Sequence, residues 1–298
     1  MRILGVIVTL AVLAVAHAAF AIEQSSAGTS STSNRDPLGE VTITGHAELA
    51  RGVSKFVDQI AARENAEGLP RWNEQVCPLV TGLPREEGEL ILGRISEVAR
   101  AAEVPLAGED CHPNLYVIVI SDPRKALAGL DVHRRMVMFG DTSDSVIRAF
   151  IDTPRAVRVW YDSRMTDPFG MPGLLPSCLF GPFCHPIFEH TIPTRLSFNR
   201  IWNFSRVVLV VDKDRLNAVS PAQLADYAAM VGLAEIRPQA RLDEAQTILK
   251  LFDSTPGAAP ARMTGWDQSF LKSLYATEQK SVSQRGEIAL TMVRDMAR

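Results

Sequence analysis

The sequence predicts an α+β fold in which a mixed β-sheet packs with helices and the C-terminal third is helical. Two continuous apolar runs rich in β-branched residues, at 115–120 and 206–212, indicate strands that are covered on both faces. After Ser220 the apolar residues recur at helical spacing. Because strands come early and helices come late, the pattern favours α+β over a regular doubly wound sheet.

The region before residue 163 alternates expected strands and helices. Pro84, followed by Glu86 and Glu87, suits the start of a helix, since proline fits the first turn and acids complement its positive end. The other elements expected here are a short strand at 41–44, a helix at 46–63, a weaker strand at 134–139, a short helix at 141–150 and a half-exposed strand at 157–161.

Helix-capping signals organise the C-terminal third. Ser220 and Gln223 form a capping-box pattern with proline at the first helical position, and Pro238 predicts an end near Ile236. Thr264 and Asp267 repeat the capping pattern before another helix, and a last helix is expected over 281–296.

The N-terminus has the features of a secretory signal peptide over residues 1–21. Arg2 precedes an apolar run at 3–15, and two A-x-A sites follow, of which cleavage after Ala21 is preferred over Ala18. The apolar run would span only about 20 Å as a helix, short of the roughly 30 Å hydrocarbon core. No later segment has the length and hydropathy of a transmembrane span, so we expect a periplasmic or secreted protein.

Residues 22–38 are rich in Ser and Thr and predict a flexible linker, because they cannot bury enough apolar surface to offset the entropy of ordering. Residues 39–298 are then expected to form a single α+β domain. The formal net charge is -3 and the basic residues are scattered. This distribution does not indicate a nucleic-acid partner.

Four cysteines allow three disulfide pairings. Cys178 and Cys184 share one loop, which leaves Cys77 to pair with Cys111. The alternative is a metal site formed by Cys178, Cys184, His185 and His190, whose side chains are all potential zinc ligands. Their spacing matches no common zinc module, and an oxidising compartment favours disulfides. We therefore predict two disulfides and no metal or other cofactor.

A long segment at 163–200 interrupts the regular pattern and is rich in proline, glycine and apolar residues. Loops of this length are uncommon and often functional. One interpretation is a cover packed over an edge of the sheet. The other is an apolar loop that contacts a partner, a ligand or a lipid surface, in the last case through Phe180 and Phe183.

The sequence contains none of the common linear catalytic motifs. G-x-S-x-G, G-x-x-x-x-G-K-[ST], G-x-G-x-x-G and H-E-x-x-H are all absent. Asp226 and Tyr227, adjacent on the helix after Ser220, are the candidate cleft residues, with Asp226 as an acid or base. The alternative interpretation is a solvated or locally hydrogen-bonded Asp226 beside a half-buried aromatic ring.

An ordered series of segments resembles a family of exported bacterial proteins without assigned activity. The segments are RWNEQVCPLVTGL at 71–83, PNLYVIVISD at 113–122, RVVLVVD at 206–212, LADYAAMVGLAEI at 224–236, QTILKLFD at 246–253 and MTGWDQSFLKSLY at 263–275.

The end of the chain is also similar to secreted domains related to zinc-dependent metallopeptidases, in which a helix with H-E-x-x-H or H-E-x-x-Q runs into Leu-Gly-Leu. Val231-Gly232-Leu233 fits that frame. The resemblance places Ala225 and Ala229 at the metal-ligand positions and Asp226 at the catalytic glutamate position. Alanine cannot bind zinc, and without the ion no water is acidified. The resemblance thus implies a degenerate zincin-like fold without peptidase activity.

The function expected from the sequence is that of an exported, non-catalytic domain, degenerate and metallopeptidase-like, that binds a protein or envelope component. The alternative is a periplasmic or secreted hydrolase with a non-standard site, with Asp226 as base and histidines from the 163–200 loop. A third hypothesis is an envelope-surface protein that inserts Phe180 and Phe183 into lipid.

Overall fold

The computed structural model describes residues 37–62, 68–167, 200–237, 240, 242, 245–253 and 259–298. In these residues a four-stranded mixed sheet has the strand order β1-β2-β4-β3. The strands are β1 (Pro78–Thr81), β2 (Leu115–Ile120), β3 (Val157–Thr166) and β4 (Ile201–Asp212). β1, β2 and β4 are parallel, and β3 pairs with β4 in the antiparallel direction. The predicted α+β class is confirmed.

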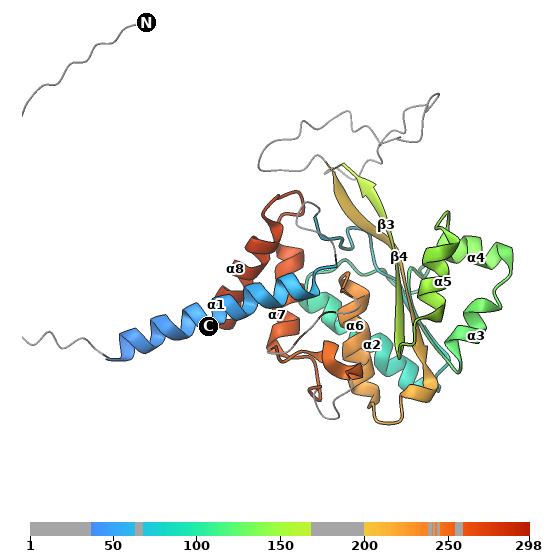
Figure 1. Cartoon of the computed structure of the whole chain (residues 1–298), viewed down its shortest axis with the longest axis horizontal. Helices are drawn as coiled ribbons and strands as arrows, with labels where there is room; N and C mark the ends of the chain where they lie inside the picture. The colour runs from blue at the N-terminus through green and yellow to red at the C-terminus, as the bar shows by residue number, and fades with distance from the viewer. Residues whose placement is uncertain are drawn as a thin grey trace, which may run out of the picture.

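Helices cover both faces of this sheet (Figure 1). One side carries α1 (Pro37–Ile60), α2 (Arg85–Ala101), α6 (Pro221–Leu233), α7 (Gly265–Ala276) and α8 (Gln284–Met296), and the other carries α3 (Pro123–Ala128), α4 (Val132–Phe139) and α5 (Asp144–Asp152). Short 3-10 turns lie at Lys213–Arg215 (η1) and Ile248–Phe252 (η2). Among the described helices, none has the length and apolar character needed to cross a membrane.

The two faces of the sheet bury separate hydrophobic clusters. On β2, Leu115, Val117 and Val119 point into the larger cluster, which also includes buried side chains of α1, α2, α6, α7 and α8. The alternate β2 residues pack against the smaller cluster, which is formed with α4 and α5. The continuous apolar sequence of 115–120 therefore has the predicted cause, because both faces of the strand are covered.

α6 begins at the predicted capping box. The Ser220 hydroxyl accepts a hydrogen bond from the Gln223 N–H, and the Gln223 side chain accepts one from the Ser220 N–H, each at 3.2 Å. The helix ends at Leu233, before the predicted end near Ile236, because Ala234 is extended and Ile236 forms a β-bridge with Ala61. Together with η2, this bridge shows that the region after Ser220 is not wholly helical.

α6 lies close to the sheet because one of its positions lacks a side chain. A Cβ atom at Gly232 would be 3.0 Å from Cδ1 of Leu115 on β2. This spacing is tighter than ordinary carbon–carbon contact, so any larger residue would displace either the helix or the leucine. Gly232 thus sets the depth at which α6 packs on the sheet.

Two predicted strands are helical, and both predictions are wrong. Residues 41–44 lie inside α1. β-Branched residues are tolerated in a helix, because each lowers its stability by less than about 1 kcal/mol relative to alanine. Residues 134–139 belong to α4, which begins where the Asp131 carboxylate accepts a hydrogen bond from the Arg134 N–H at 2.8 Å. α4 ends at Gly140, which has a positive φ. These capping signals outweigh the local strand propensity.

Cys77 and Cys111 form the predicted disulfide. It links the residue before β1 to the segment before β2 and so closes the chain around α2. The signal peptide, the linker up to residue 36 and the predicted Cys178–Cys184 pair, with His185 and His190, lie outside the described residues. So does the 168–199 part of the predicted loop; its first residues, up to Thr166, belong to β3 instead.

Candidate functional site

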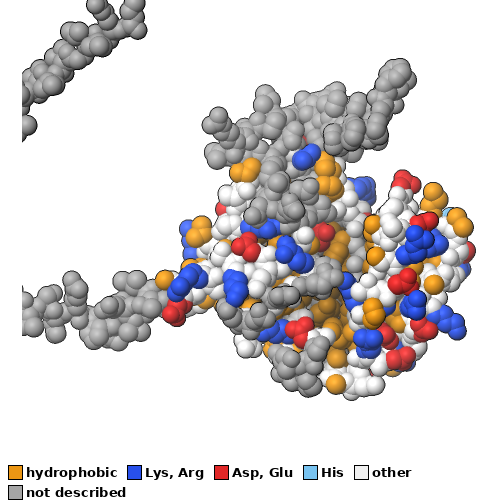
Figure 2. Space-filling model, viewed as in Figure 1, with side chains coloured by type: hydrophobic (Ala, Val, Ile, Leu, Met, Phe, Trp, Pro, Cys, Tyr) orange, Lys and Arg blue, Asp and Glu red, His pale blue; other side chains and the backbone are white. Residues whose placement is uncertain are grey.

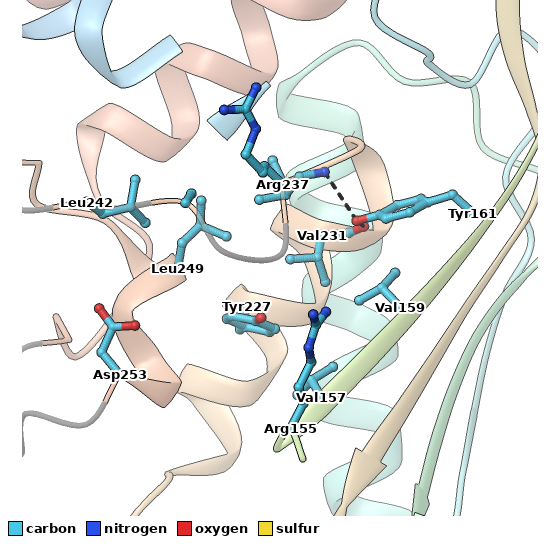
Figure 3. A pocket seen from close by; sticks show the side chains of 12 residues that line it. Arg155, Val157, Val159, Tyr161, Tyr227, Val231, Arg237, Leu242, Leu249 and Asp253 are labelled. Carbon is cyan, nitrogen blue, oxygen red and sulfur yellow. Dashed lines mark hydrogen bonds between the residues drawn. The ribbon is translucent and has the colours of Figure 1, made fainter. Parts of the chain in front are cut away.

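A groove with a cavity of about 100 Å³ lies between β3 and α6. Figure 3 shows its lining, and Figure 2 shows hydrophobic side chains gathered between the two elements on the same face of the molecule. We call it the β3–α6 groove and define it by Val157, Val159 and Tyr161 of β3, Tyr227 and Val231 of α6, and Leu249 of η2. Arg155, Arg237 and Asp253 supply its charged groups.

The strand wall of the groove follows from the alternation of side chains along β3. Val157, Val159 and Tyr161 point toward α6 and join the larger cluster. Trp160 points the other way, where its ring makes edge-on contacts with Phe139 and Phe150. The aromatic packing of Trp160 therefore fixes which residues of β3 face the groove.

Tyr161 ties this wall to the end of α6. Its hydroxyl donates a hydrogen bond to the Val231 carbonyl at 2.9 Å and accepts one from the Ile236 N–H at 3.4 Å (Figure 3). Burial raises the pKa of Tyr161 well above its ordinary value. The phenol therefore stays neutral and acts as a structural link between β3 and α6.

Tyr227 forms the helix wall together with Val231, one turn further along α6. Its ring meets that of Phe252 edge-on, with centroids 5.0 Å apart. Burial raises the pKa of Tyr227 to about 12. The groove thus presents a neutral phenol and aliphatic groups at its centre.

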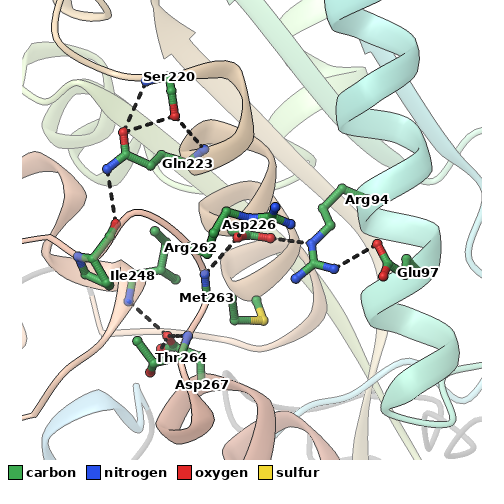
Figure 4. A network of polar contacts seen from close by, with 11 residues as sticks. Arg94, Glu97, Ser220, Gln223, Asp226, Ile248, Arg262, Met263, Thr264 and Asp267 are labelled. Atoms are coloured by element: carbon green, nitrogen blue, oxygen red, sulfur yellow. Dashed lines mark hydrogen bonds and ion pairs between the residues drawn. The ribbon is translucent and has the colours of Figure 1, made fainter.

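Asp226 points away from the groove, toward α2 (Figure 4). Its side chain is fully buried, and its oxygens accept hydrogen bonds from Arg94, from Arg262 Nε at 2.9 Å and from the Met263 N–H at 2.7 Å. Burial by itself raises the pKa of this carboxyl, but these hydrogen bonds outweigh it and hold the pKa below its ordinary value. Asp226 is therefore an ionised residue of a structural network.

Ala225 and Ala229, which the metallopeptidase resemblance assigns to metal-ligand positions, are completely buried. They are four residues apart and share one face of α6, whereas Tyr227 and Val231 share another. Only the second pair lines the groove. The groove thus receives side chains from α6 positions other than those that the resemblance singles out.

The charged residues of the groove were not predicted from the sequence. Arg155 lies between α5 and β3, and its guanidinium group extends beside Val157 toward Tyr227 (Figure 3). Asp253 follows η2, and partial burial raises the pKa of its carboxyl despite the opposing charge of Lys250. No local motif marks either residue, because only the pairing of distant segments brings them together.

A second cavity, of about 340 Å³, lies between α2, α7 and α8. Its charged side chains pair with each other: Arg94 with Glu97 at 2.8 Å, and Lys272 with Asp295 at 3.1 Å. Because these pairs already balance the charges around the cavity, it is a weaker candidate for a binding site than the β3–α6 groove.

Within the described residues, no three His, Cys, Asp or Glu side chains lie close enough together to hold a metal ion. The alternative ligands Cys178, Cys184, His185 and His190 are outside that set. Comparison of the chain with protein-family models, with curated proteins and with solved structures gives no match. The site is therefore interpreted from its geometry.

Proposed function

We propose that the protein is an exported, non-catalytic binding domain, with a degenerate metallopeptidase-like scaffold, whose β3–α6 groove binds an extended segment of polypeptide. One observation carries the proposal: among the described strands β3 lies at an edge of the sheet, and the groove, with Val157, Val159 and Tyr161 as its wall, runs along it. Alternate residues of an edge strand direct their N–H and C=O groups away from the sheet, where an added strand can pair with them.

Strand addition would use both the edge of β3 and the groove beside it. Backbone hydrogen bonds to the edge supply affinity that does not depend on sequence, and a pocket beside the edge selects alternate side chains of the ligand. On β3 the stretch from Val157 to Asp162 pairs on one side with β4, and no other described strand pairs with it on the other side. Val157, Val159 and Tyr161 provide an apolar wall next to that edge.

The non-catalytic part of the proposal is supported by the residues that α6 contributes. Asp226 is the one acidic residue of this helix, and its two oxygens accept hydrogen bonds from Arg94 of α2 and from the segment before α7, away from the groove. The groove side carries Tyr227, whose raised pKa keeps the phenol protonated at neutral pH. Neither residue is suited to activate water for attack in the groove.

Export is supported by the signal-like sequence at 1–21 and by the Cys77–Cys111 disulfide, since such bonds persist mainly in oxidising compartments. The ligand would then be a segment of an envelope or secreted protein.

The test is a binding assay with the purified, oxidised protein. Fluorescein-labelled hexapeptides that alternate apolar and polar residues are titrated, and fluorescence anisotropy is measured. We expect saturable binding that is lost in Val159→Glu, because a carboxylate in the apolar wall would have to be desolvated. Val137→Glu is the matched control, since Val137 is 56% exposed on α4, across the sheet. Absence of peptide binding, or equal loss in both variants, would contradict the proposal.

A second candidate function is hydrolysis with Asp253 as general base. The raised pKa of Asp253 and its place at the groove favour it. Incubation of the protein with quenched fluorescent peptides and esters distinguishes the two functions. Turnover that is abolished in Asp253→Asn would support the hydrolase, whereas intact substrates together with measurable peptide binding would support the binding domain.

A further inference from the structure

One cation of the β3–α6 groove, Arg155, has no partner of opposite charge among the described residues. Its side chain is half-buried, and no hydrogen bond or ion pair joins its guanidinium group to another residue in the described part of the chain. In Figure 3 this group lies beside Tyr227, whereas that of Arg237 points away from Tyr227. A half-buried cation without an ion-pair partner, directed into a groove, is a favourable position for an anionic group of a ligand.

Two of the three charged residues that line the groove are arginines, and Asp253, the one carboxylate in the lining, forms no ion pair with Arg155 among the described residues. Tyr227 stays neutral and does not balance the charge. Arg158 lies close to Arg155. Burial lowers the pKa of Arg158, and the nearby positive charges of Arg215 and Arg155 lower it further, whereas Asp212 and Asp122 act in the opposite direction. Arg158 donates its own hydrogen bonds to the Arg155 and Thr153 carbonyls, so its guanidinium group is held by the backbone and does not pair with a side chain of the groove.

We propose that the β3–α6 groove binds the C-terminal end of a polypeptide, with the terminal carboxylate on Arg155 and an apolar side chain of the terminal segment in the cavity. This inference rests on the proposed function and adds to it the identity of the end that is bound and the direction of the bound chain.

The position of Arg155 in the chain sets that direction. Arg155 precedes the first residue of β3, Val157, by two positions. A ligand strand antiparallel to β3 brings its C-terminal end to Val157 and therefore to Arg155. A parallel ligand would bring its amino end there, and its ammonium group would meet a like charge. Antiparallel pairing is also slightly the more stable arrangement per residue.

The size of the cavity favours a peptide over a larger apolar ligand. Small-molecule sites usually enclose about 300–1,000 Å³. The cavity in the groove is about 100 Å³, which suits a single aliphatic side chain. The rest of the ligand would then be held by the edge of β3, which offers backbone groups to a peptide but no apolar channel to an alkyl chain.

The test compares two forms of one hexapeptide that ends in leucine, one with a free C-terminal carboxylate and one with a C-terminal amide. A charge-assisted hydrogen bond between Arg155 and the terminal carboxylate, at a partly exposed site, predicts that the acid binds about tenfold more tightly than the amide. Arg155→Gln is expected to remove this preference, and Arg155→Lys to retain part of it. Arg148→Gln, which neutralises an exposed arginine on α5, is the matched control and should bind like the unmodified protein.

Equal affinity for acid and amide would overturn the C-terminal inference while leaving the proposed function intact, because a peptide would still bind. Loss of the preference in Arg237→Gln but not in Arg155→Gln would also overturn it. Hexanoate that competes as strongly as the peptide acid would show that the carboxylate need not belong to a polypeptide and would contradict the proposal. If neither peptide form binds, the proposed function itself fails.

Discussion

The guanidinium group of Arg94 on α2 donates a hydrogen bond to the fully buried carboxylate of Asp226 on α6. The same carboxylate accepts hydrogen bonds from Arg262 and from the Met263 N–H, on the segment that leads into α7. One side chain thus joins two helices and the start of a third. Because Asp226 is held against α2, the next residue, Tyr227, is turned about 100° around the helix axis, toward β3.

Removal of the Asp226 carboxylate should destabilise the fold strongly. Asp226→Ala leaves Arg94 and the Met263 N–H without their buried partner, which predicts a loss of about 3–5 kcal/mol in the free energy of unfolding. Glu97→Ala removes the exposed partner of the same arginine and should cost under about 1 kcal/mol. Urea unfolding followed by circular dichroism measures both. Similar losses in the two variants would contradict the structural role of Asp226.

The contribution of Asp226 should depend on pH in a defined direction. Its pKa is lower in the folded protein than the ordinary value of 3.8, so the stability it adds is present above that value and is lost as pH falls through the folded pKa. The difference in unfolding free energy between the unmodified protein and Asp226→Ala should be constant from neutral pH to about pH 5 and shrink below about pH 4. A difference that grows on acidification would show the opposite sign.

Gly232 and Gly93 should respond to alanine in opposite ways. Gly232→Ala forces a Cβ to within 3.0 Å of Leu115, and overpacking of this kind predicts a loss of about 1–3 kcal/mol. Gly93 is exposed inside α2, and a methyl group at this position would have nothing within 4 Å, so Gly93→Ala should stabilise by about 0.5–1 kcal/mol. Thermal unfolding of the two variants tests this contrast. A stabilising Gly232→Ala would mean that α6 packs less closely on β2.

The Cys77–Cys111 disulfide should stabilise the protein mainly by restricting the unfolded chain. The two cysteines are 34 residues apart, which in the chain-entropy model corresponds to about 3–4 kcal/mol. The double variant Cys77→Ser with Cys111→Ser should lose stability of that size in urea. Dithiothreitol added to this double variant isolates any contribution of Cys178 and Cys184. A double variant as stable as the oxidised protein would contradict the prediction.

Local sequence signals predicted the elements whose stability is decided locally or by continuous burial. The Ser220–Gln223 capping box marks the start of α6, and the apolar run at 115–120 marks a strand buried on both faces. The strand predicted at 134–139 is a helix because the Asp131 cap and the Gly140 end favour a helix between them, and a single β-branched residue, Val137, does not oppose it strongly. Those two capping residues were the available signal.

The candidate site was less predictable, because it is formed by contacts between distant segments. The sequence predicts Asp226 and Tyr227 as cleft residues, yet adjacent residues on a helix point about 100° apart, and only Tyr227 lines the groove. Helical periodicity is thus the sequence signal that separates the two. Arg155 and Asp253 had no such signal, since they meet the groove only after β3 pairs with β4 and η2 packs on α6.

Hydrogen exchange of the backbone amides, measured by NMR with and without a bound hexapeptide, tests strand addition to β3 most directly. In the complex, alternate amides between Val157 and Asp162 should exchange more slowly, because the N–H groups on the outer side of β3 gain acceptors from the peptide. Amides of β1, at the opposite edge of the sheet, should be unchanged. Slower exchange on β1 or α4, with no change along β3, would place the ligand elsewhere and refute the proposed mode of binding.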